Sequence, residues 1–228
     1  MALAYPYFLV NCKTYDGTTG EDGLAFARTI QRVVEDTGRR FAIAPQLPDI
    51  RLIADRTTLP VVAQAGTRRE DATMGGVTLE AVAAAGADAV FVTHPENDAA
   101  FGDLPRLIDR CEHLGLESIV TVNGLDGARA ALSFGPDCLL LERPDDVASE
   151  GGLVRADPDR VEAFVELVAS ERPETRTFVG GGIRTADDVG RAFSCGVDAT
   201  GAASAAVDAP GREAWLRSIA DAVPRSLE

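Results

Sequence analysis

The chain is almost without lysine. Of its 22 cationic side chains, 21 are arginine, and Lys13 is the single lysine among 228 residues. Aspartate and glutamate number 36, so the net charge of −14 argues against nucleic acid or an anionic membrane as a partner. An acid excess with so little lysine predicts a surface adapted to high salt; the codon bias of a GC-rich genome is the alternative.

Long apolar runs and clustered metal ligands are also missing. No stretch reaches the roughly 18 apolar residues of a membrane span, and no early segment has the basic flank and apolar core of a signal peptide. The four cysteines lie far apart without a C-x-x-C pair, which favours reduced, mostly buried thiols in a cytoplasmic protein: Cys12, Cys111, Cys138 and Cys195. The acidic residues Asp145, Asp146 and Glu150 have no clustered histidines beside them, so we expect no metal site.

Eight short apolar runs recur along the chain, and most are followed by a helical pattern. They are residues 7–13, 41–46, 61–66, 89–96, 118–123, 138–144, 177–183 and 199–204. Strands buried on both faces that alternate with helices form a parallel sheet. Eight such units in about 220 residues predict one (β/α)8 barrel domain over residues 1–228.

Three helices are the clearest in the sequence, at residues 20–37, 98–114 and 158–171. The second shows the i, i+3, i+4 spacing of a helix packed on a sheet and ends in Gly115 as a C-cap. The third has Asp157 as N-cap and Pro158 at its first position. Trp215, in a last helix, is expected to pack rather than to act in a site.

Polar residues stand at the carboxyl ends of the predicted strands, where barrels of this class place their chemistry. They are Asn11, Lys13, Gln64, His94, Glu96, Asn123 and Glu142. Strand alternation puts Asn11 and Lys13 on one face and Cys12 on the other. If Cys12 packs outward under the helices, both polar side chains face the barrel mouth, and Lys13 becomes a site residue.

These residues form a set that resembles the triosephosphate isomerase family, in particular its archaeal branch. The set consists of N-x-K after the first strand, H-x-E after the fourth, a glutamate after the sixth and "GGGI" after the seventh. The resemblance runs from about residue 7 to residue 210. It implies the TIM-barrel fold, a small phosphorylated sugar as substrate, no cofactor, no metal, and a homo-oligomer that is a dimer or a tetramer.

The resemblance also implies roles for individual residues. Asn11 would line the substrate pocket, Lys13 would be the cation beside the substrate, and His94 the neutral electrophile. Glu96 would help hold the site, and Glu142 would be the base that moves a proton between adjacent carbons. Such chemistry requires a base that removes a proton alpha to a carbonyl, and hydrogen-bond donors where the enediolate oxygens gather negative charge.

Phosphate is expected on backbone N–H groups rather than on a cluster of cations. Gly180, Gly181 and Gly182 permit close approach of the chain, and a helix beginning near Thr185 adds its positive end. The run from Ala202 to Ala205 falls where the family has its eighth-strand phosphate loop, which assigns Ala203, Ser204 and Ala205 to phosphate.

Several positions depart from the family. Pro95 stands between His94 and Glu96, and removes a backbone N–H where the histidine is expected to meet the start of a helix. The loop that follows Glu142 differs at its hinge, and Ala205 replaces a glycine.

Three interpretations therefore stay open. The first is a triose-phosphate isomerase of glycolysis and gluconeogenesis that interconverts glyceraldehyde 3-phosphate and dihydroxyacetone phosphate. The second is an isomerase of another short sugar phosphate, such as a four-carbon ketose phosphate. The third is a non-catalytic barrel that binds a phosphorylated metabolite, against which the retained Glu142 argues.

Overall fold

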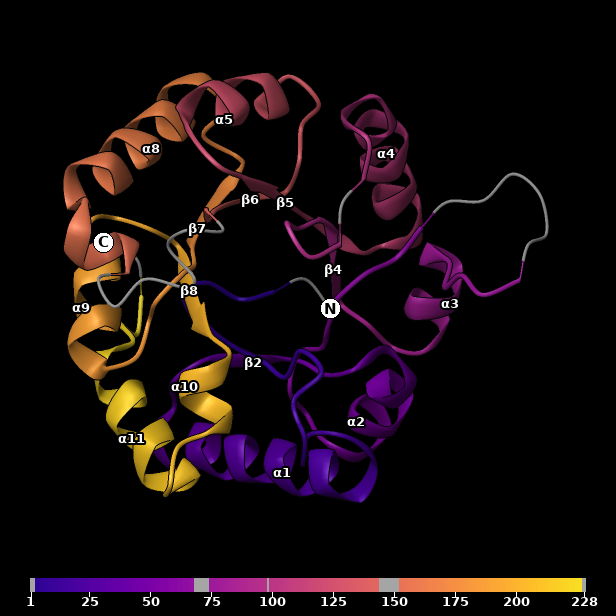
Figure 1. Ribbon diagram of the computed structural model, residues 1–228, viewed down its shortest axis with the longest axis vertical. Helices are drawn as coiled ribbons and strands as arrows, with labels where there is room; N and C mark the ends of the chain where they lie inside the picture. Colours follow the sequence, from indigo (N-terminus) through magenta and orange to yellow (C-terminus); the bar gives the residue numbers. More distant parts are fainter. Residues whose placement is uncertain (1–2, 68–73, 98, 144–151, 227–228) are drawn as a thin grey trace.

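Eight parallel strands form a nearly closed barrel in the computed structural model, which describes residues 3–67, 74–97, 99–143 and 152–226 (Figure 1). The strands are β1 (Tyr7–Asn11), β2 (Phe41–Ala44), β3 (Val62–Ala63), β4 (Ala89–Thr93), β5 (Glu117–Val122), β6 (Cys138–Leu141), β7 (Arg176–Val179) and β8 (Ala199–Ala202). They pair in the order β2-β1-β8-β7-β6-β5-β4-β3. A parallel bridge between Ile43 and Val61 brings the two edges together. The predicted fold class is confirmed.

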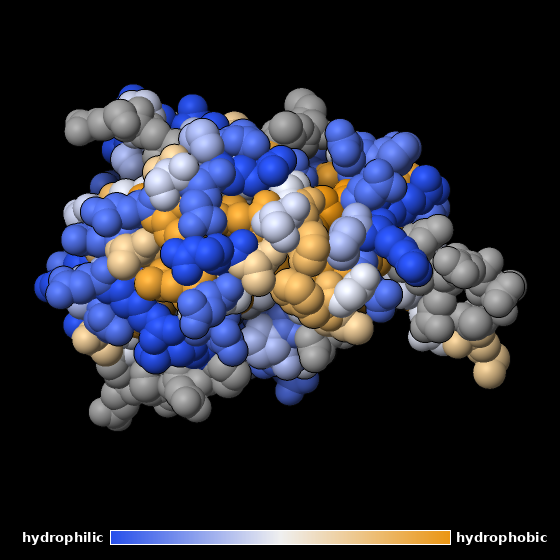
Figure 2. All heavy atoms as spheres, turned by 90° about the horizontal axis from the view of Figure 1, so that it is seen from above, coloured by the Kyte–Doolittle hydropathy of each residue, from blue (hydrophilic) through white to orange (hydrophobic). Residues whose placement is uncertain are grey.

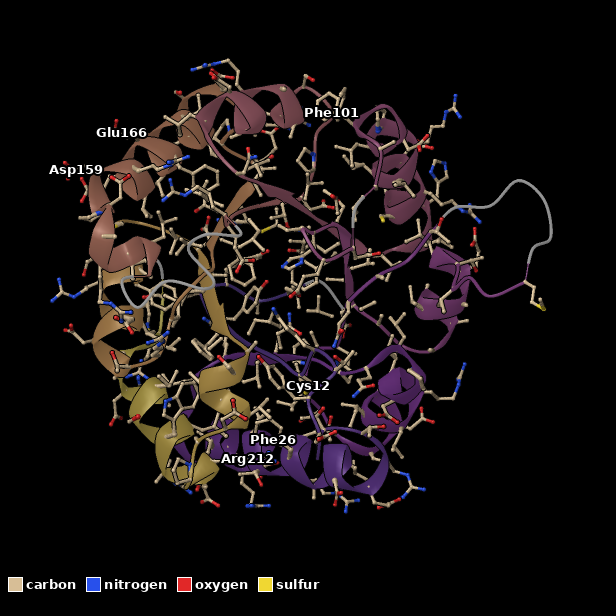
Figure 3. All side chains as sticks on the ribbon, in the orientation of Figure 1. Cys12, Phe26, Phe101, Asp159, Glu166 and Arg212 are labelled. Carbon is tan, nitrogen blue, oxygen red and sulfur yellow. The ribbon has the colours of Figure 1, made fainter. Side chains whose placement is uncertain are left out.

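Helices surround this barrel (Figure 1). They are α1 (Gly20–Thr37), α2 (Ile50–Arg56), α3 (Leu79–Ala84), α4 (Leu104–Leu114), α5 (Leu125–Leu132), α7 (Leu153–Ala156), α8 (Pro158–Glu171), α9 (Ala186–Ser194), α10 (Ser204–Val207) and α11 (Arg212–Ala222), with short 3₁₀ turns at Leu47–Asp49 and Phe101–Asp103. Helix α11 packs against α1, where the Arg212 guanidinium lies 4.6 Å from the centre of the Phe26 ring (Figure 3).

The core has two layers because successive strand residues face opposite sides. Inside the barrel lie Tyr7, Leu9, Phe91, Ile119, Leu140 and Phe178. The residues between them pack outward under the helices, and Cys12 belongs to this outer layer, where it is 1% exposed. The predicted outward packing of Cys12 is therefore confirmed. Asn11 and Lys13 face the other way, toward the carboxyl end of the barrel.

Polar side chains cover much of the face seen in Figure 2, with apolar atoms showing between them. Among the described residues, the large apolar side chains that are exposed are Met74, Val77 and Phe101. Phe101 lies at the outer rim between α4 and α5 (Figure 3), with its ring centre 5.0 Å from that of Phe134.

Most predicted elements match the structure, and two details do not. Helices 20–37 and 158–171 are confirmed, and Gly115 ends α4 with φ +69°. Helix α4 begins at Leu104 and not near residue 98. Asp157 occupies the N-cap position of α8, but its side chain accepts no capping hydrogen bond.

The cysteines are free, and three of the four are buried, in agreement with the prediction. Among the described residues, no helix combines the length and the apolar composition that crossing a bilayer requires.

Candidate active site

A cavity of about 100 Å³ opens at the carboxyl ends of the strands. Its lining includes most of the predicted site residues: Asn11, Lys13, His94, Glu142, Gly180, Gly181, Gly182, Ala203 and Ser204. Two predicted residues lie outside the lining. Glu96 is mostly exposed at the rim, and Ala205 is half-buried and packs against the core.

The backbone of Lys13 is held in a conformation that side-chain-bearing residues rarely adopt. Its φ is +41°, and it is the one non-glycine residue with positive φ among those described. Left-handed backbone costs about 1–2 kcal/mol per residue. Two side chains offset this cost, because Asn11 Oδ1 accepts from the Lys13 N–H at 2.9 Å and Gln64 Nε2 donates to the Lys13 carbonyl at 3.0 Å. Gln64 also donates to the Ala44 carbonyl, which fixes it to β2.

The Lys13 ammonium lies against Glu96 at the rim of the cavity. Its Nζ is 2.9 Å from each carboxylate oxygen of Glu96. The lysine side chain is 21% exposed, whereas that of Glu96 is 61% exposed. Glu96 therefore orients the cation from the solvent side and leaves the inner side of the ammonium facing the cavity.

The tautomer of His94 follows from its two contacts. Its Nδ1 accepts a hydrogen bond from the Glu96 backbone N–H at 3.1 Å, so the ring proton of the neutral imidazole is on Nε2. Nε2 in turn donates to Glu142 Oε2 at 3.0 Å. A neutral ring with its proton directed into the cavity is a hydrogen-bond donor for an oxygen that gains negative charge.

Pro95 does not remove the donor that His94 uses, which corrects the expectation from the sequence. The N–H group on Nδ1 belongs to Glu96. No described residue between His94 and Ala100 is helical; the chain instead makes a turn closed by two hydrogen bonds between His94 and Asn97. His94 therefore meets a turn, and not the start of a helix.

Glu142 follows β6 and is largely buried, with its side chain 12% exposed. Its N–H donates to the Val122 carbonyl, which continues the pairing with β5 beyond the strand. A side chain on Gly180 would place its Cβ 3.2 Å from the Glu142 carboxylate. Gly180 thus leaves room for the carboxylate, a role distinct from the predicted phosphate contact.

The turn after β7 has the shape of an anion site. Gly181 and Gly182 have φ of +82° and +74°, in the left-handed region that favours glycine. Backbone N–H groups of successive residues in such turns converge on an anion. The phosphate cradle at these glycines stays a prediction, and this backbone geometry supports it.

Asp188 anchors the far end of the same turn. It is 1% exposed, and its Oδ2 accepts from the N–H groups of Arg184 and Thr185 at 2.9 Å each, which completes a capping box at the start of α9. Burial alone raises the pKa of this carboxyl, but the hydrogen bonds from Arg184, Arg155 and Thr185 outweigh it, and the pKa lies below its usual value.

Sequence reasoning missed several residues of this region. Arg155 pairs with Asp188, and the Trp215 indole N–H donates to the Arg184 carbonyl at 3.0 Å, so Trp215 both packs on Phe8 and holds the edge of the site. The T-x-x-D spacing of the capping box was a readable signal. Arg155 and Trp215 carry no motif that could have identified them.

Two predicted features fall outside the described residues, and Asn123 lies within them. The altered loop hinge and the acidic residues Asp145, Asp146 and Glu150 fall in 144–151, which lies outside the described residues. Within the described residues, no group of three or more His, Cys, Asp or Glu side chains is arranged to hold a metal ion. Asn123 is exposed at the rim, and its carbonyl accepts from Arg160.

The chain was compared with known families and proteins. The sequence profile of the family described as triosephosphate isomerase matches residues 6–133. The triosephosphate isomerase of Methanothermobacter thermautotrophicus is 32% identical over 219 residues, which cover 92% of this chain and 93% of that protein. The enzyme of Methanocaldococcus jannaschii is 29% identical over 212 residues, which cover 92% of this chain and 97% of that protein.

Solved structures agree on the fold. The crystal structure of triosephosphate isomerase from Bartonella henselae has a TM-score of 0.70 at 17% identity and covers 95% of this chain and 98% of that one. The crystal structure of an archaeal fructose 1,6-bisphosphate aldolase has a TM-score of 0.66 at 16% identity and covers 96% of this chain and 93% of that one. At these identities the likeness concerns the barrel alone.

Proposed function

This chain belongs to the triosephosphate isomerase family, and from that membership we propose that it interconverts glyceraldehyde 3-phosphate and dihydroxyacetone phosphate. It is an isomerase with the family's barrel. The observation that carries the proposal is the hydrogen bond of 3.0 Å between His94 Nε2 and Glu142 Oε2 in a cavity that Lys13 and the glycine turn also line.

Glu142 is the proposed general base. Its carboxylate is sheltered at the barrel mouth and can take a proton from the carbon next to the substrate carbonyl. The same group returns the proton to the neighbouring carbon while the hydroxyl proton passes from one substrate oxygen to the other, which completes the exchange between ketose and aldose. The protons removed from one carbon are added to the other, so the reaction needs neither an external oxidant nor a cofactor.

His94 and Lys13 stabilise the enediolate that forms between these steps. In the structure the Nε2 proton is directed at Glu142. A bound substrate places its oxygens between the two side chains, so we expect Nε2 to donate to a substrate oxygen instead. The Lys13 ammonium, held by Glu96 from outside, supplies positive charge to the same oxygens. Preorganised donors of this kind act where charge develops in the transition state.

The test is a coupled isomerase assay with the three-carbon substrate at low and at molar salt. Turnover within the usual range of about 1–10³ per second supports the proposal. Binding of the phosphate ester without exchange of its carbon-bound hydrogen into solvent would instead support the non-catalytic alternative.

One observation favours a longer substrate as a second candidate. His94 and Glu142 also line a neighbouring cavity of about 480 Å³, together with Thr93, Thr121 and Phe101. The Thr121 hydroxyl is buried and has no hydrogen-bond partner among the described residues. A four-carbon ketose phosphate carries an additional hydroxymethyl group that this space could receive. Faster conversion of that substrate than of the triose phosphate would establish the second candidate.

Assembly, habitat and location are further parts of the proposal. We propose a cytoplasmic homo-oligomer, a dimer or a tetramer, that serves glycolysis and gluconeogenesis at high salt. Membership of the triosephosphate isomerase family supports assembly. The net charge of −14 supports the salt requirement. Light scattering after size exclusion, at low and at molar salt, measures the oligomeric state directly.

A further inference from the structure

The carbonyl groups of the glycine turn are held by the chain segment that includes α7. The Leu153 N–H donates to the Gly181 carbonyl at 3.4 Å, and Arg155 Nη2 donates to the Gly182 carbonyl at 3.2 Å. Gly152 approaches so closely that a Cβ there would lie 2.8 Å from the Gly182 oxygen. Helix α7 therefore packs directly on the peptide groups of the turn.

Holding these carbonyls also fixes the direction of the N–H groups that follow them. A trans peptide is planar, and its C=O and N–H point in opposite directions. Because the Gly181 and Gly182 carbonyls point toward α7, the N–H groups of Gly182 and Ile183 point away from it. Both residues line the cavity, and neither N–H donates to another described residue.

Arg155 connects the middle of this turn to its anchor. Its Nη1 pairs with Asp188 Oδ1, while the other oxygen of Asp188 holds the N–H groups of Arg184 and Thr185. One guanidinium thus bridges the Gly182 carbonyl and a buried carboxylate. A planar guanidinium makes both contacts through two separate nitrogens, whereas the three donors of an ammonium all sit on one nitrogen. Arg155 does not line the cavity.

We propose that Arg155 is a positioning residue, which orients the peptide groups of Gly182 and Ile183 so that their N–H groups bind the phosphate of the substrate. The proposal rests on the proposed function in that it takes a phosphate ester as the ligand. Arg155 acts through the backbone of the turn and does not itself contact the phosphate.

The experiment compares Arg155→Met with a matched control, Arg191→Met. Arg191 also pairs with an aspartate of α9, Asp187, but it is exposed and lies outside the cavity lining. Phosphate binding is measured by titrating inorganic phosphate against the fluorescence of Trp215, the single tryptophan, whose indole contacts the Arg184 carbonyl. Steady-state kinetics are measured with glyceraldehyde 3-phosphate and with unphosphorylated glyceraldehyde.

For Arg155→Met we expect KM for the phosphate ester and the dissociation constant of phosphate to rise about tenfold, the scale of one hydrogen bond, with a smaller change in kcat. The loss in kcat/KM should be several times greater for the phosphate ester than for glyceraldehyde. Arg191→Met should match the unaltered protein in phosphate affinity. Equal losses for both substrates, or unchanged phosphate affinity, would overturn the proposal.

Arg155→Lys covers the case in which the methionine variant does not fold. Lysine keeps a positive charge beside Asp188, but its side chain is shorter and its donors sit on one nitrogen, so we expect it to lose the contact with the Gly182 carbonyl. Phosphate affinity should then still fall while thermal stability is retained. A lysine variant with full phosphate affinity contradicts the proposal. If the unaltered protein binds phosphate but does not isomerise the triose phosphate, the proposed function fails, and the phosphate titration still decides the role of Arg155.

Discussion

Gln64 Nε2 donates to the main-chain carbonyl of Lys13 at 3.0 Å, while the Asn11 side chain holds the N–H of the same residue. The lysine backbone is thus fixed from both sides in its left-handed conformation. We call these two hydrogen bonds, from Asn11 and from Gln64, the Lys13 clamp. Together with the ion pair between the ammonium and Glu96, the clamp places the ammonium at the barrel mouth.

Replacing Gln64 by leucine should release one half of the clamp. The Lys13 carbonyl loses its donor, and the strained φ relaxes because left-handed backbone is unfavourable by about 1–2 kcal/mol. We expect kcat to fall about tenfold, as for the loss of one hydrogen bond, with little change in KM. Thr58→Val, a similar loss of a polar group at a distant exposed loop, is the control. A Gln64→Leu enzyme with unaltered kcat would show that the clamp is dispensable.

Glu142→Gln should leave the fold and ligand binding nearly intact and remove most turnover. The amide oxygen can still accept from His94 Nε2, so the shape of the site is kept, but the base is lost. Acid–base groups contribute about 10²–10⁴-fold, and kcat should fall by that amount. The measurements are kcat and the affinity for phosphate. A variant that keeps more than about a tenth of the activity is incompatible with Glu142 as the general base.

Pro95→Ser should change activity by less than about threefold, within the usual effect of a surface substitution. The N–H group that fixes the tautomer of His94 comes from Glu96, and serine at position 95 does not replace it. Steady-state kinetics at one pH suffice for this comparison. A large fall in kcat would show that the turn from His94 to Asn97 depends on the proline ring.

Asp188→Asn should weaken the fold most at neutral pH. The folded-state pKa of Asp188 is below its usual value of 3.8, so its ionised form stabilises the fold above that pH, and this contribution is lost as the pH falls through the folded pKa. Urea unfolding at pH 7 should show a loss of about 1–3 kcal/mol, the range for a buried group deprived of charged hydrogen bonds. The difference between the two proteins should shrink toward pH 3. An equal difference at both pH values would assign the effect to packing.

The sequence predicted the barrel and most residues of the cavity lining, because the alternation of residues within each strand and the succession of strands and helices can be read directly from the sequence. Asn11, Lys13, His94 and Glu142 end their strands on the inner face, and parallel strands bring such ends together. The start of α4 was predicted wrongly although the sequence held a signal for it, since Pro105 fits the first turn of a helix but would disrupt a helix that began near residue 98.

The contacts that orient these residues were not readable. Gln64 meets the carbonyl of Lys13 from 51 positions away, and Arg155 meets Gly182 from 27 positions away. Neither contact follows from a periodic pattern, because each depends on how a loop settles on the finished barrel. Pro95 shows the converse error: the missing N–H was visible in the sequence, but which N–H the histidine uses was not.

The geometry around Lys13 makes a sharp prediction for its replacement by the residue that supplies every other cation of the chain. The lysine Nζ lies 2.9 Å from both oxygens of Glu96, on a backbone with φ +41°. An ammonium is compact and can approach one developing oxygen charge closely, whereas a guanidinium is wider, planar and spreads its charge. In Lys13→Arg the longer head group should pair with Glu96 and project past the reacting oxygens or crowd Asn11 and His94.

We therefore expect Lys13→Arg to fold normally and to lose roughly 10²–10³-fold in kcat, the scale seen on removing one transition-state donor. The melting temperature should change little, because a cation remains beside an exposed carboxylate. The matched control is Arg191→Lys, which makes the opposite exchange at an exposed arginine outside the cavity lining and should leave kcat unchanged. Near-full activity of the arginine variant would mean that Lys13 contributes only its positive charge. Catalysis would then not explain why this position has the single lysine of the chain.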